Sequence, residues 1–333
     1  MMARLMGLPD DFVIPEDNWA LSKTVMGNGV HGAVTTQIIG PVADLGSEIA
    51  QRGQMELFQS GASEKVAATP GIQNVLKYLN PDEARKLKAN TAQRLIDLID
   101  ELPDPGELAS VAFAGRAKRG WYLESAKAIL DVFGLEDSRR FTGLLAATSP
   151  QTSVESNLVN TLAVWNAWVS AGRPVDKAQI LALMGESVQG DKGEESVLPA
   201  WRNNSYRILI AENPTTVILS GPKVNSFMLN LRGVVDEVTN DTWMANIMGV
   251  QQTMFAGSIT KTDPGKGPGY MAANVVTRRA AEILSKRTGL DWTPAEIQET
   301  IWSWARTLGQ LGEVKGETRS FVQILTDGEL TDE

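Results

Sequence analysis

The sequence predicts a mostly α-helical protein that begins with an irregular N-terminal arm. From about residue 71 onward, apolar residues recur at three- and four-residue spacing, the period of helices that bury one face. Residues 1–70 are instead rich in glycine and small residues and show no sustained helical period, so we expect extended chain there, with short strands around VTTQII. We therefore expect an extended or loosely ordered arm over residues 1–70, a helical domain over 71–325 and an acidic tail over 326–333.

Start and stop signals bound the predicted helices. Ser153 precedes an apolar run as an N-cap, and Gly134 and Gly172 end their segments, because glycine readily adopts the conformation that closes a helix. Thr293 and Pro294 begin the last segment, and a glutamate three residues after Thr293 completes a capping box. The expected helices span 81–102, 120–134, 138–148, 153–172, 175–185, 201–212, segments that begin near 222 and 241, 270–289 and 293–309.

Composition excludes several classes of chemistry. The chain has no cysteine, which excludes disulfides, thiolate zinc sites, iron–sulfur clusters and cysteine nucleophiles. Its one histidine, His31, lies in a glycine-rich segment without a Gly-x-Ser-x-Gly element, so a histidine-based triad is not favoured. We expect no metal and no cofactor. No apolar run reaches the roughly 18 residues that span a bilayer, so we expect a soluble, cytoplasmic protein.

Charge is distributed unevenly along the chain. The formal net charge of −9 repels nucleic acid on average. Basic residues nevertheless gather before an aromatic pair, where Arg116, Lys118 and Arg119 precede Trp121 and Tyr122. Such a segment can contact a nucleic-acid backbone and stack on a base. It can equally be a loop that leads into a helix whose Trp121 packs in the core, and the sequence leaves both interpretations open.

The segment 219–249 carries the strongest candidates for catalysis. Ser220, Gly221 and Pro222 predict a sharp turn that delivers Lys223 to the start of a helix. Backbone N–H groups at a helix start suit a phosphate, and a partly desolvated lysine has a lowered pKa and can attack an electrophilic carbon such as C1′ of a sugar. The alternative is a solvated lysine at an ordinary helix start.

Asp241 follows Lys223 by eighteen residues and precedes a second apolar segment. Its position predicts the N-cap of that helix. A carboxylate fixed in this way can also stabilise an oxocarbenium-like sugar or deprotonate a nucleophile. The two roles are compatible, because a cap holds the carboxylate in place.

These motifs resemble the endonuclease III and 8-oxoguanine DNA glycosylase superfamily. LSGPKV followed by VTNDTWMA is similar to the helix-hairpin-helix and catalytic-aspartate region of that family. The resemblance implies that Lys223 is the Schiff-base lysine, that Asp241 is the catalytic aspartate and that Gly221 belongs to the DNA-binding hairpin. Trp243 stands where many members have histidine. The implied fold is a helix-hairpin-helix DNA glycosylase-like domain, with two helical lobes around a cleft.

A second segment, FTGLLAATSPQTSVESNLVN, resembles the Leu-Leu-Ser-x-Gln-x-Thr segment of endonuclease III. In that family it lies beside the flipped base, which implies contacts with base or backbone for Gln151, Thr152 and Asn157. The alternative is a polar turn between helices, capped by Thr152 or Ser153. The order of motifs over roughly residues 110–310 also resembles a group of phage-encoded proteins, whose final helix here carries Gln298, a further candidate for substrate binding.

Three hypotheses about function follow from these residues and resemblances. The preferred one is a phage-encoded DNA glycosylase-like enzyme, in which Lys223 attacks a flipped, modified or damaged base unit in double-stranded DNA and Asp241 stabilises the charge that develops. The second keeps the fold but joins an amino acid or amine to an activated 5-hydroxymethyluracil in DNA, as in thymine hypermodification. The third is a DNA-binding or structural phage protein without catalysis. The first two place the protein in the cytoplasm of a bacterial host cell.

Overall fold

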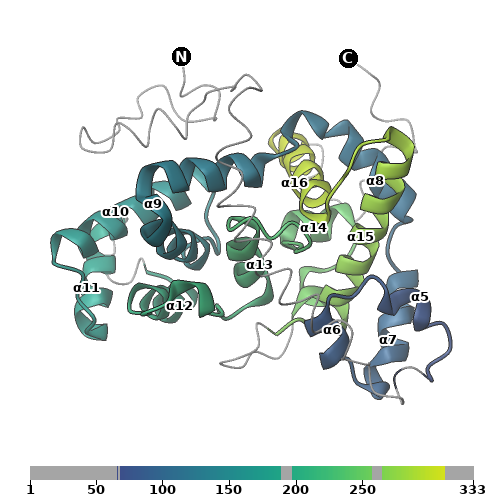
Figure 1. Ribbon diagram of the computed structural model, residues 1–333, viewed down its shortest axis with the longest axis horizontal. Helices are drawn as coiled ribbons and strands as arrows, with labels where there is room; N and C mark the ends of the chain where they lie inside the picture. The colour runs from purple at the N-terminus through teal and green to yellow at the C-terminus, as the bar shows by residue number, and fades with distance from the viewer. Residues whose placement is uncertain (1–65, 67, 189–196, 257–264, 312–333) are drawn as a thin grey trace. The chain divides into compact units, whose positions relative to one another are not determined.

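The computed structural model describes residue 66 and residues 68–188, 197–256 and 265–311. These residues form helices joined by turns, without a β-strand among them, so the mostly α-helical class is confirmed for this part of the chain (Figure 1). Within the same ranges, no helix is long and apolar enough to cross a membrane. The predicted arm up to residue 65, with its strands and His31, and the acidic tail lie outside the described residues.

The chain divides into two compact units. The middle unit contains Glu124–Ser220, and the split unit contains the described residues up to Leu123 and from Gly221 onward. The middle unit holds most of α9 (Trp121–Ala147), together with α10 (Val154–Ser170), α11 (Lys177–Ser187), α12 (Pro199–Leu209) and η4 (Pro214–Thr216). The split unit holds α5 (Gln73–Leu76), α6 (Pro81–Lys86), α7 (Ala89–Asp100), α8 (Pro105–Ala114), η2 (Arg116–Lys118), α13 (Pro222–Asn230), α14 (Thr242–Ile247), η5 (Gln252–Phe255), α15 (Pro268–Thr288) and α16 (Pro294–Leu311).

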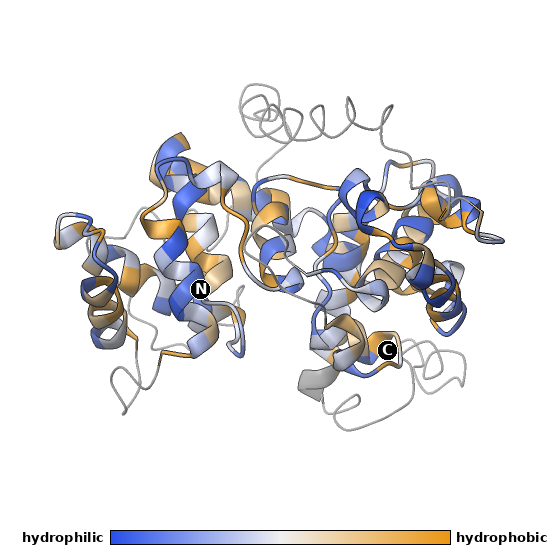
Figure 2. Cartoon of the chain, turned by 90° about the horizontal axis from the view of Figure 1, so that it is seen from below, coloured by the Kyte–Doolittle hydropathy of each residue, from blue (hydrophilic) through white to orange (hydrophobic). Residues whose placement is uncertain are grey.

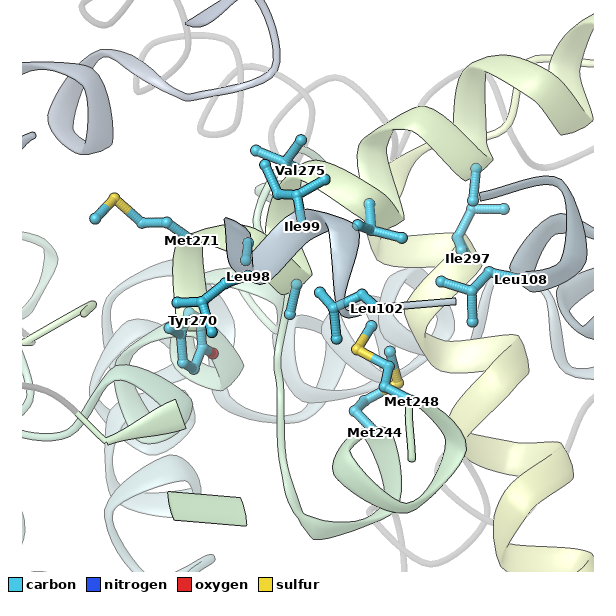
Figure 3. Packing of buried hydrophobic residues seen from close by; sticks show 14 of the residues in the cluster. Leu98, Ile99, Leu102, Leu108, Met244, Met248, Tyr270, Met271, Val275 and Ile297 are labelled. Carbon is cyan, nitrogen blue, oxygen red and sulfur yellow. The ribbon is translucent and has the colours of Figure 1, made fainter. Parts of the chain in front are cut away.

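Helix α15 is the centre of the split unit. It packs against α7, α8 and α16, and α16 in turn packs against α8 and α14. Figure 3 shows the core that these helices share, with side chains from α7, α8, α14, α15 and α16 in one cluster. Hydrophilic and hydrophobic residues are both present along the helices, as expected where one face of a helix is buried (Figure 2). Gly115 lets α16 approach closely, since a Cβ there would lie 2.2 Å from the carbonyl oxygen of Thr300.

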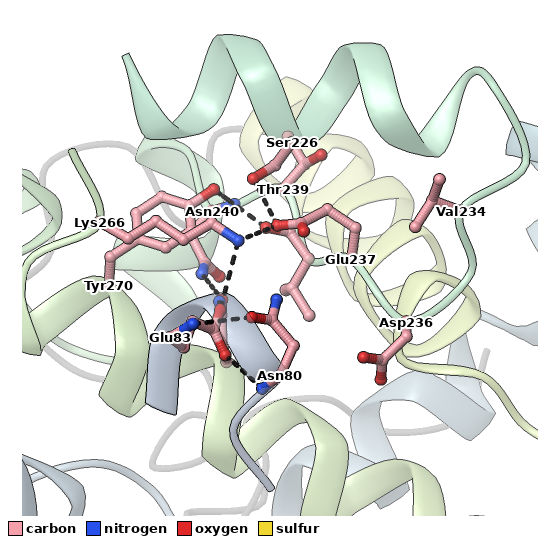
Figure 4. Close-up of polar contacts among 12 residues, drawn as sticks. Asn80, Glu83, Ser226, Val234, Asp236, Glu237, Thr239, Asn240, Lys266 and Tyr270 are labelled. Atoms are coloured by element: carbon pink, nitrogen blue, oxygen red, sulfur yellow. Dashed lines mark hydrogen bonds and ion pairs between the residues drawn. The ribbon is translucent and has the colours of Figure 1, made fainter. Parts of the chain in front are cut away.

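A buried ion network joins distant parts of the split unit (Figure 4). At its centre Glu83, on α6, is only 2% exposed. Arg278 Nη1 and Asn274 Nδ2, both on α15, each donate to its carboxylate over 2.6 Å. Lys266 Nζ lies 3.2 Å from Oε1, and the backbone nitrogen of Asn80 donates to Oε2 over 3.0 Å. Burial acts to raise the pKa of Glu83, but Arg278 and Lys266 outweigh it and lower this pKa from 4.5 to about 2.

The same network fixes the segment that leads to Asp241. Glu237 is buried and forms an ion pair with Lys266, the cation that also contacts the α6 carboxylate. Three residues later, the backbone nitrogen of Asn240 donates to the hydroxyl of Tyr270 over 3.0 Å. The segment just before Asp241 is therefore bound to Tyr270 of α15 and to Lys266, two residues before that helix begins, by buried interactions.

The helix predicted over residues 81–102 is in fact two helices, so that prediction was wrong in its continuity. Helix α6 ends at Lys86, Leu87 adopts an extended conformation, and α7 begins at Ala89. The reason is tertiary, because α6 is fixed through Glu83 by side chains of α15, and Leu87 is buried. Asn80 and Glu83 form a capping box at the start of α6. Helix α8, which begins with Asp104 as N-cap and a proline at its first position, was not predicted from the sequence.

The middle unit follows the predicted helix boundaries more closely. Gly134 interrupts α9 with a φ of 68°, at the position where the sequence predicted an end. Ser153 caps α10, as predicted, and accepts a hydrogen bond from the backbone nitrogen of Ser156. Arg140 Nη1 donates to the carbonyl oxygens of Ile208 and Leu209 over 2.9 and 2.7 Å. These carbonyl groups lie at the end of α12, where they have no hydrogen-bond partner within the helix.

Replacing Glu83 with glutamine is expected to destabilise the protein at neutral pH. The folded-state pKa of Glu83 lies below its ordinary value, so its stabilisation is fully present above about pH 4.5 and is lost as the pH falls toward 2. The shift corresponds to about 3 kcal/mol at pH 7. Urea unfolding of Glu83→Gln, followed by circular dichroism, should show a loss of this order at pH 7 and roughly half of it at pH 3.

Glu282→Gln is the matched control. The pKa of Glu282 is also lowered to about 2, but its partners Lys286 and Tyr78 form surface contacts. Exposed ion pairs contribute little to stability because water and salt screen them. A loss in Glu282→Gln equal to that in Glu83→Gln, or a Glu83→Gln difference that does not change with pH, would contradict the central role of the buried network.

Candidate functional site

Lys223 stands in the first turn of α13, as predicted. Gly221, directly before the helix, has a φ of 97°, a conformation that favours glycine and makes the sharp turn possible. Pro222 occupies the first helical position, where its missing N–H leaves no hydrogen bond unmade. The Lys223 side chain is partly exposed, and its Nζ lies 5.3 Å from the centre of the Phe227 ring, one turn further along the helix.

Asp241 is the N-cap of α14, as predicted. Its Oδ1 accepts hydrogen bonds from the backbone nitrogens of Trp243 and Met244 over 2.9 and 3.2 Å. Its Oδ2 accepts a hydrogen bond from the indole Nε1 of Trp302 on α16 over 2.9 Å. The carboxylate is therefore held on both oxygens, by the helix that it caps and by a second helix.

Lys223 and Asp241 influence each other electrostatically. Burial lowers the pKa of the Lys223 ammonium, and the negative charge of Asp241 partly offsets this effect. Burial likewise raises the pKa of Asp241, whereas Lys223 and the hydrogen bonds from Met244, Trp302 and Trp243 act to lower it. Both groups are thus moved toward their neutral forms, and more of Lys223 is a free amine at a given pH than in an exposed lysine.

Four aromatic rings contact one another, and two of them contact this pair, Phe227 beside Lys223 and Trp302 on Asp241. We name them the aromatic cluster: Trp121, Tyr122, Phe227 and Trp302. The Trp121 ring lies nearly parallel to Phe227, with centroids 6.5 Å apart and planes 10° apart. It also contacts Trp302, with centroids 6.2 Å apart, and Tyr122, at 5.1 Å. Tyr122 is buried, whereas the other three rings are partly exposed. The lysine and the aspartate therefore lie at an aromatic surface that solvent reaches.

Two buried polar side chains of α16, Gln298 and Glu299, hydrogen-bond to residues at the start of α9. The Tyr122 hydroxyl donates to Gln298 Oε1 over 2.7 Å, and Gln298 is 1% exposed. Glu299, 2% exposed, accepts hydrogen bonds from the backbone nitrogens of Gly120 and, over 2.7 Å, Tyr122. Gln298 was predicted as a substrate contact; in the structure it is buried and accepts the hydrogen bond of the Tyr122 hydroxyl.

The other predicted residues of the split unit lie near the start of α9 and at α14. Arg116 and Lys118 are exposed in η2, and the guanidinium of Arg116 lies 4.3 Å from the centre of the exposed Phe113 ring. Trp243 is partly exposed and packs against the hydrophobic core. Of the predicted residues, Lys223, Asp241 and Trp121 meet around the aromatic cluster, since Trp302 bonds to Asp241 and touches Trp121.

Gln151, in the middle unit, has an unusual backbone conformation. Its φ is 61°, in the left-handed region that few residues other than glycine adopt, and its side chain is exposed. The turn is held by the indole Nε1 of Trp201, which donates to the carbonyl oxygen of Pro150 over 3.0 Å. The strained turn therefore presents an amide side chain to the solvent.

Thr152 and Asn157 stabilise the same turn. Thr152 Oγ1 donates to the carbonyl oxygen of Ser149 over 3.2 Å. Asn157 is 4% exposed, its Nδ2 donates to the carbonyl oxygen of Leu145 over 2.9 Å, and its Oδ1 accepts from Thr148 Oγ1 over 2.7 Å. A direct contact between Asn157 and a substrate would require these internal hydrogen bonds to break.

Three residues that build the site, Phe227, Trp302 and Glu299, were not among the candidates predicted from sequence. Phe227 and Trp302 are partly exposed beside Lys223 and Asp241, respectively. Tyr122 was part of the predicted basic and aromatic segment, and Glu299 belonged to no motif. The spacing of Phe227, one turn after Lys223, was the one local signal that the ring would lie beside the amine.

The matched family model spans residues 113–308 and is described as a family of unknown function, DUF7178. The chain belongs to this family. The match includes the aromatic cluster, the Lys223 and Asp241 pair and the Gln151 turn. No significant match was found among curated proteins or among solved structures. Within the described ranges, no group of three or more His, Cys, Asp or Glu side chains is arranged to hold a metal ion.

Replacing Asp241 with asparagine is expected to lower the pKa of Lys223 further. The amide oxygen can still cap α14, but the negative charge that opposes the effect of burial is lost. The rate at which an amine-directed reagent labels Lys223, followed by mass spectrometry across a pH series, should reach its midpoint at lower pH in Asp241→Asn than in the wild type.

Lys177 provides an internal control for the labelling. Its Nζ also lies over an aromatic ring, 5.6 Å from the centre of Tyr206, but it hydrogen-bonds to Asn203 and is exposed. Its labelling profile should be the same in both proteins. An unchanged or higher midpoint for Lys223 in Asp241→Asn would show that the two charges do not interact.

Proposed function

We propose that this protein is a DNA base-processing enzyme of the helix-hairpin-helix DNA glycosylase type, with Lys223 as nucleophile. The observation that carries the proposal is the placement of Lys223 and Asp241 at the starts of α13 and α14, beside the rings of Phe227 and Trp302, where burial lowers the pKa of the lysine. A nucleophilic amine must be neutral to attack, and a lysine with a lowered pKa meets this need. These are the two residues that the resemblance to the glycosylase superfamily assigns to catalysis.

In the proposed reaction, the neutral Lys223 amine attacks C1′ of the target nucleotide. A new nitrogen–C1′ bond forms as the C1′–N bond to the base breaks, and the base leaves with the electron pair of the broken bond. Asp241 stabilises the positive charge on the sugar and accepts a proton from the lysine nitrogen, which then passes to the departing base. Opening of the sugar ring gives a Schiff base between Lys223 and C1′.

The aromatic cluster supports a nucleobase as the group that is bound. Flat aromatic rings stack on bases of any sequence, and Trp121, Phe227 and Trp302 are partly exposed beside the amine. Exposed Arg116 and Lys118 precede the cluster in the chain and supply positive charge for a phosphate backbone. We further propose that the exposed Gln151 contacts DNA. The resemblance to phage-encoded proteins supports action in the cytoplasm of an infected bacterium.

Borohydride trapping tests the nucleophile directly. Duplex oligonucleotides that each carry one 5-hydroxymethyluracil, 8-oxoguanine or abasic site are incubated with the protein and sodium borohydride, which reduces a Schiff base to a stable amine. The wild type should form a covalent protein–DNA adduct and Lys223→Ala should form none. Asp241→Asn should form it at least roughly 100-fold more slowly, the scale of losing a positioned acid–base group.

Lys177→Ala is the matched control, because it removes another lysine beside an aromatic ring. It should trap as well as the wild type. Absence of an adduct with every duplex, or equal trapping by Lys223→Ala, would refute the lysine mechanism. Mass spectrometry of the digested DNA gives the reaction: loss of a base supports glycosylase action, whereas a heavier nucleoside formed with an added amine would instead support the transferase hypothesis.

A further inference from the structure

Glu299 has no part in the proposed reaction, yet its carboxylate lies buried against the start of α9. It accepts hydrogen bonds from the backbone nitrogens of Gly120 and, over 2.7 Å, Tyr122. The first N–H groups of a helix have no partner within the helix, so they need an acceptor from elsewhere. Between these two bonded nitrogens lies Trp121, the residue whose ring touches both Phe227 and Trp302.

The start of α9 depends on this distant acceptor because the residue before the helix cannot cap it. Gly120 precedes the helix with a φ of 92° and has no side chain to offer. The acceptor comes instead from α16, the helix that also carries Trp302 and, through Gln298, binds the Tyr122 hydroxyl. Helix α16 thus holds the first residues of α9 both by backbone and by side chain.

An ionised carboxylate suits this position because both of its oxygens accept hydrogen bonds from backbone N–H groups. A glutamine of the same shape has one oxygen and one NH₂ group, and the NH₂ group would face a backbone N–H. Burial raises the pKa of Glu299, whereas the hydrogen bonds from backbone N–H groups favour its charged form and oppose this shift. Burying an ionisable group costs stability, whereas an ordinary side-chain cap at position 120 would satisfy the helix at the surface.

We propose that Glu299 is a positioning residue, which fixes Trp121 against Phe227 and Trp302 so that the aromatic cluster presents a stacking surface to the planar ring of the substrate. The identity of that ring as a nucleobase rests on the proposed function. The fixing of Trp121 by Glu299 is independent of the proposed function, because it concerns contacts within the split unit alone.

Fluorine NMR of the full chain labelled with 5-fluorotryptophan tests whether Glu299 fixes the position of Trp121. The chain has nine tryptophans, and the Trp121 and Trp302 resonances are assigned by their loss in Trp121→Phe and Trp302→Phe. Glu299→Gln should shift and broaden the Trp121 resonance. The resonances of the buried Trp165 and Trp168 should stay in place, because both residues lie in the middle unit, away from the substitution.

Glu282→Gln, an exposed glutamate on α15, should leave every tryptophan resonance unchanged. Glu299→Ala should displace Trp121 further than Glu299→Gln, because the alanine offers no acceptor. If the alanine variant does not fold, the glutamine variant decides alone. An unchanged Trp121 resonance in folded Glu299→Gln would overturn the inference.

A trapping titration with the 5-hydroxymethyluracil and abasic duplexes tests whether the position of Trp121 affects substrate binding. Glu299→Gln should need at least about 10-fold more DNA than the wild type for half-maximal adduct formation, about 1.4 kcal/mol in apparent affinity, and should approach wild-type yield at saturation. Lys223→Ala should form no adduct at any concentration. Trp121 displaced without a change in the DNA titration would overturn the substrate role of Glu299. If the wild type forms no adduct, both the proposed function and the substrate role of Glu299 are refuted. The NMR result would still decide whether Glu299 fixes Trp121.

Discussion

The carboxylate of Glu83 joins stretches of the split unit that are nearly 200 residues apart in sequence. It binds α6 to α15 through Asn274 and Arg278, and through Lys266 it is linked to the buried Glu237. Charges in a protein interior are stable only when they are paired and hydrogen-bonded on most sides. Lys266 also pairs with Glu237, and Arg278 also pairs with Asp236, so each cation of the network is shared between two carboxylates.

The buried ion network also fixes the position of Asp241 in the candidate site. The segment from Glu237 to Asn240 is bound to the network and to Tyr270, so the backbone that enters Asp241 has little freedom. Asp241 then begins α14 and receives the indole hydrogen bond of Trp302. A carboxylate fixed in this way is preorganised, and it exerts a constant field on the Lys223 amine instead of rotating into solvent.

The aromatic cluster is fixed by a second, smaller group of buried polar residues. Gln298 and Glu299 hold Tyr122 and the backbone on either side of Trp121, while Trp302 one turn later holds Asp241. One helix, α16, thereby connects the carboxylate to the rings. Trp121 and Trp302 are partly exposed, whereas the Tyr122 hydroxyl and the backbone nitrogen of Tyr122 are hydrogen-bonded to buried groups of α16.

The sequence by itself determined the local features of this protein. The helical class, the turn at Gly221 before Lys223, the capping role of Asp241 and the capping box of Thr293 and Glu296 all follow from residues within a few positions of one another. Caps and periodicity are short-range interactions, so a single sequence is enough to predict them. The same reasoning left open whether Lys223 and Asp241 meet.

Only the tertiary structure decided which side chains share one environment. The break at Leu87, the burial of Gln298 and the exposure of Phe227 and Trp302 depend on partners from distant helices. Glu299 had no local signal, because its donors at Gly120 and Tyr122 lie more than 170 residues away. Burial and pairing are properties of the packed chain, since desolvation and hydrogen bonding depend on what surrounds a group and not on its neighbours in sequence.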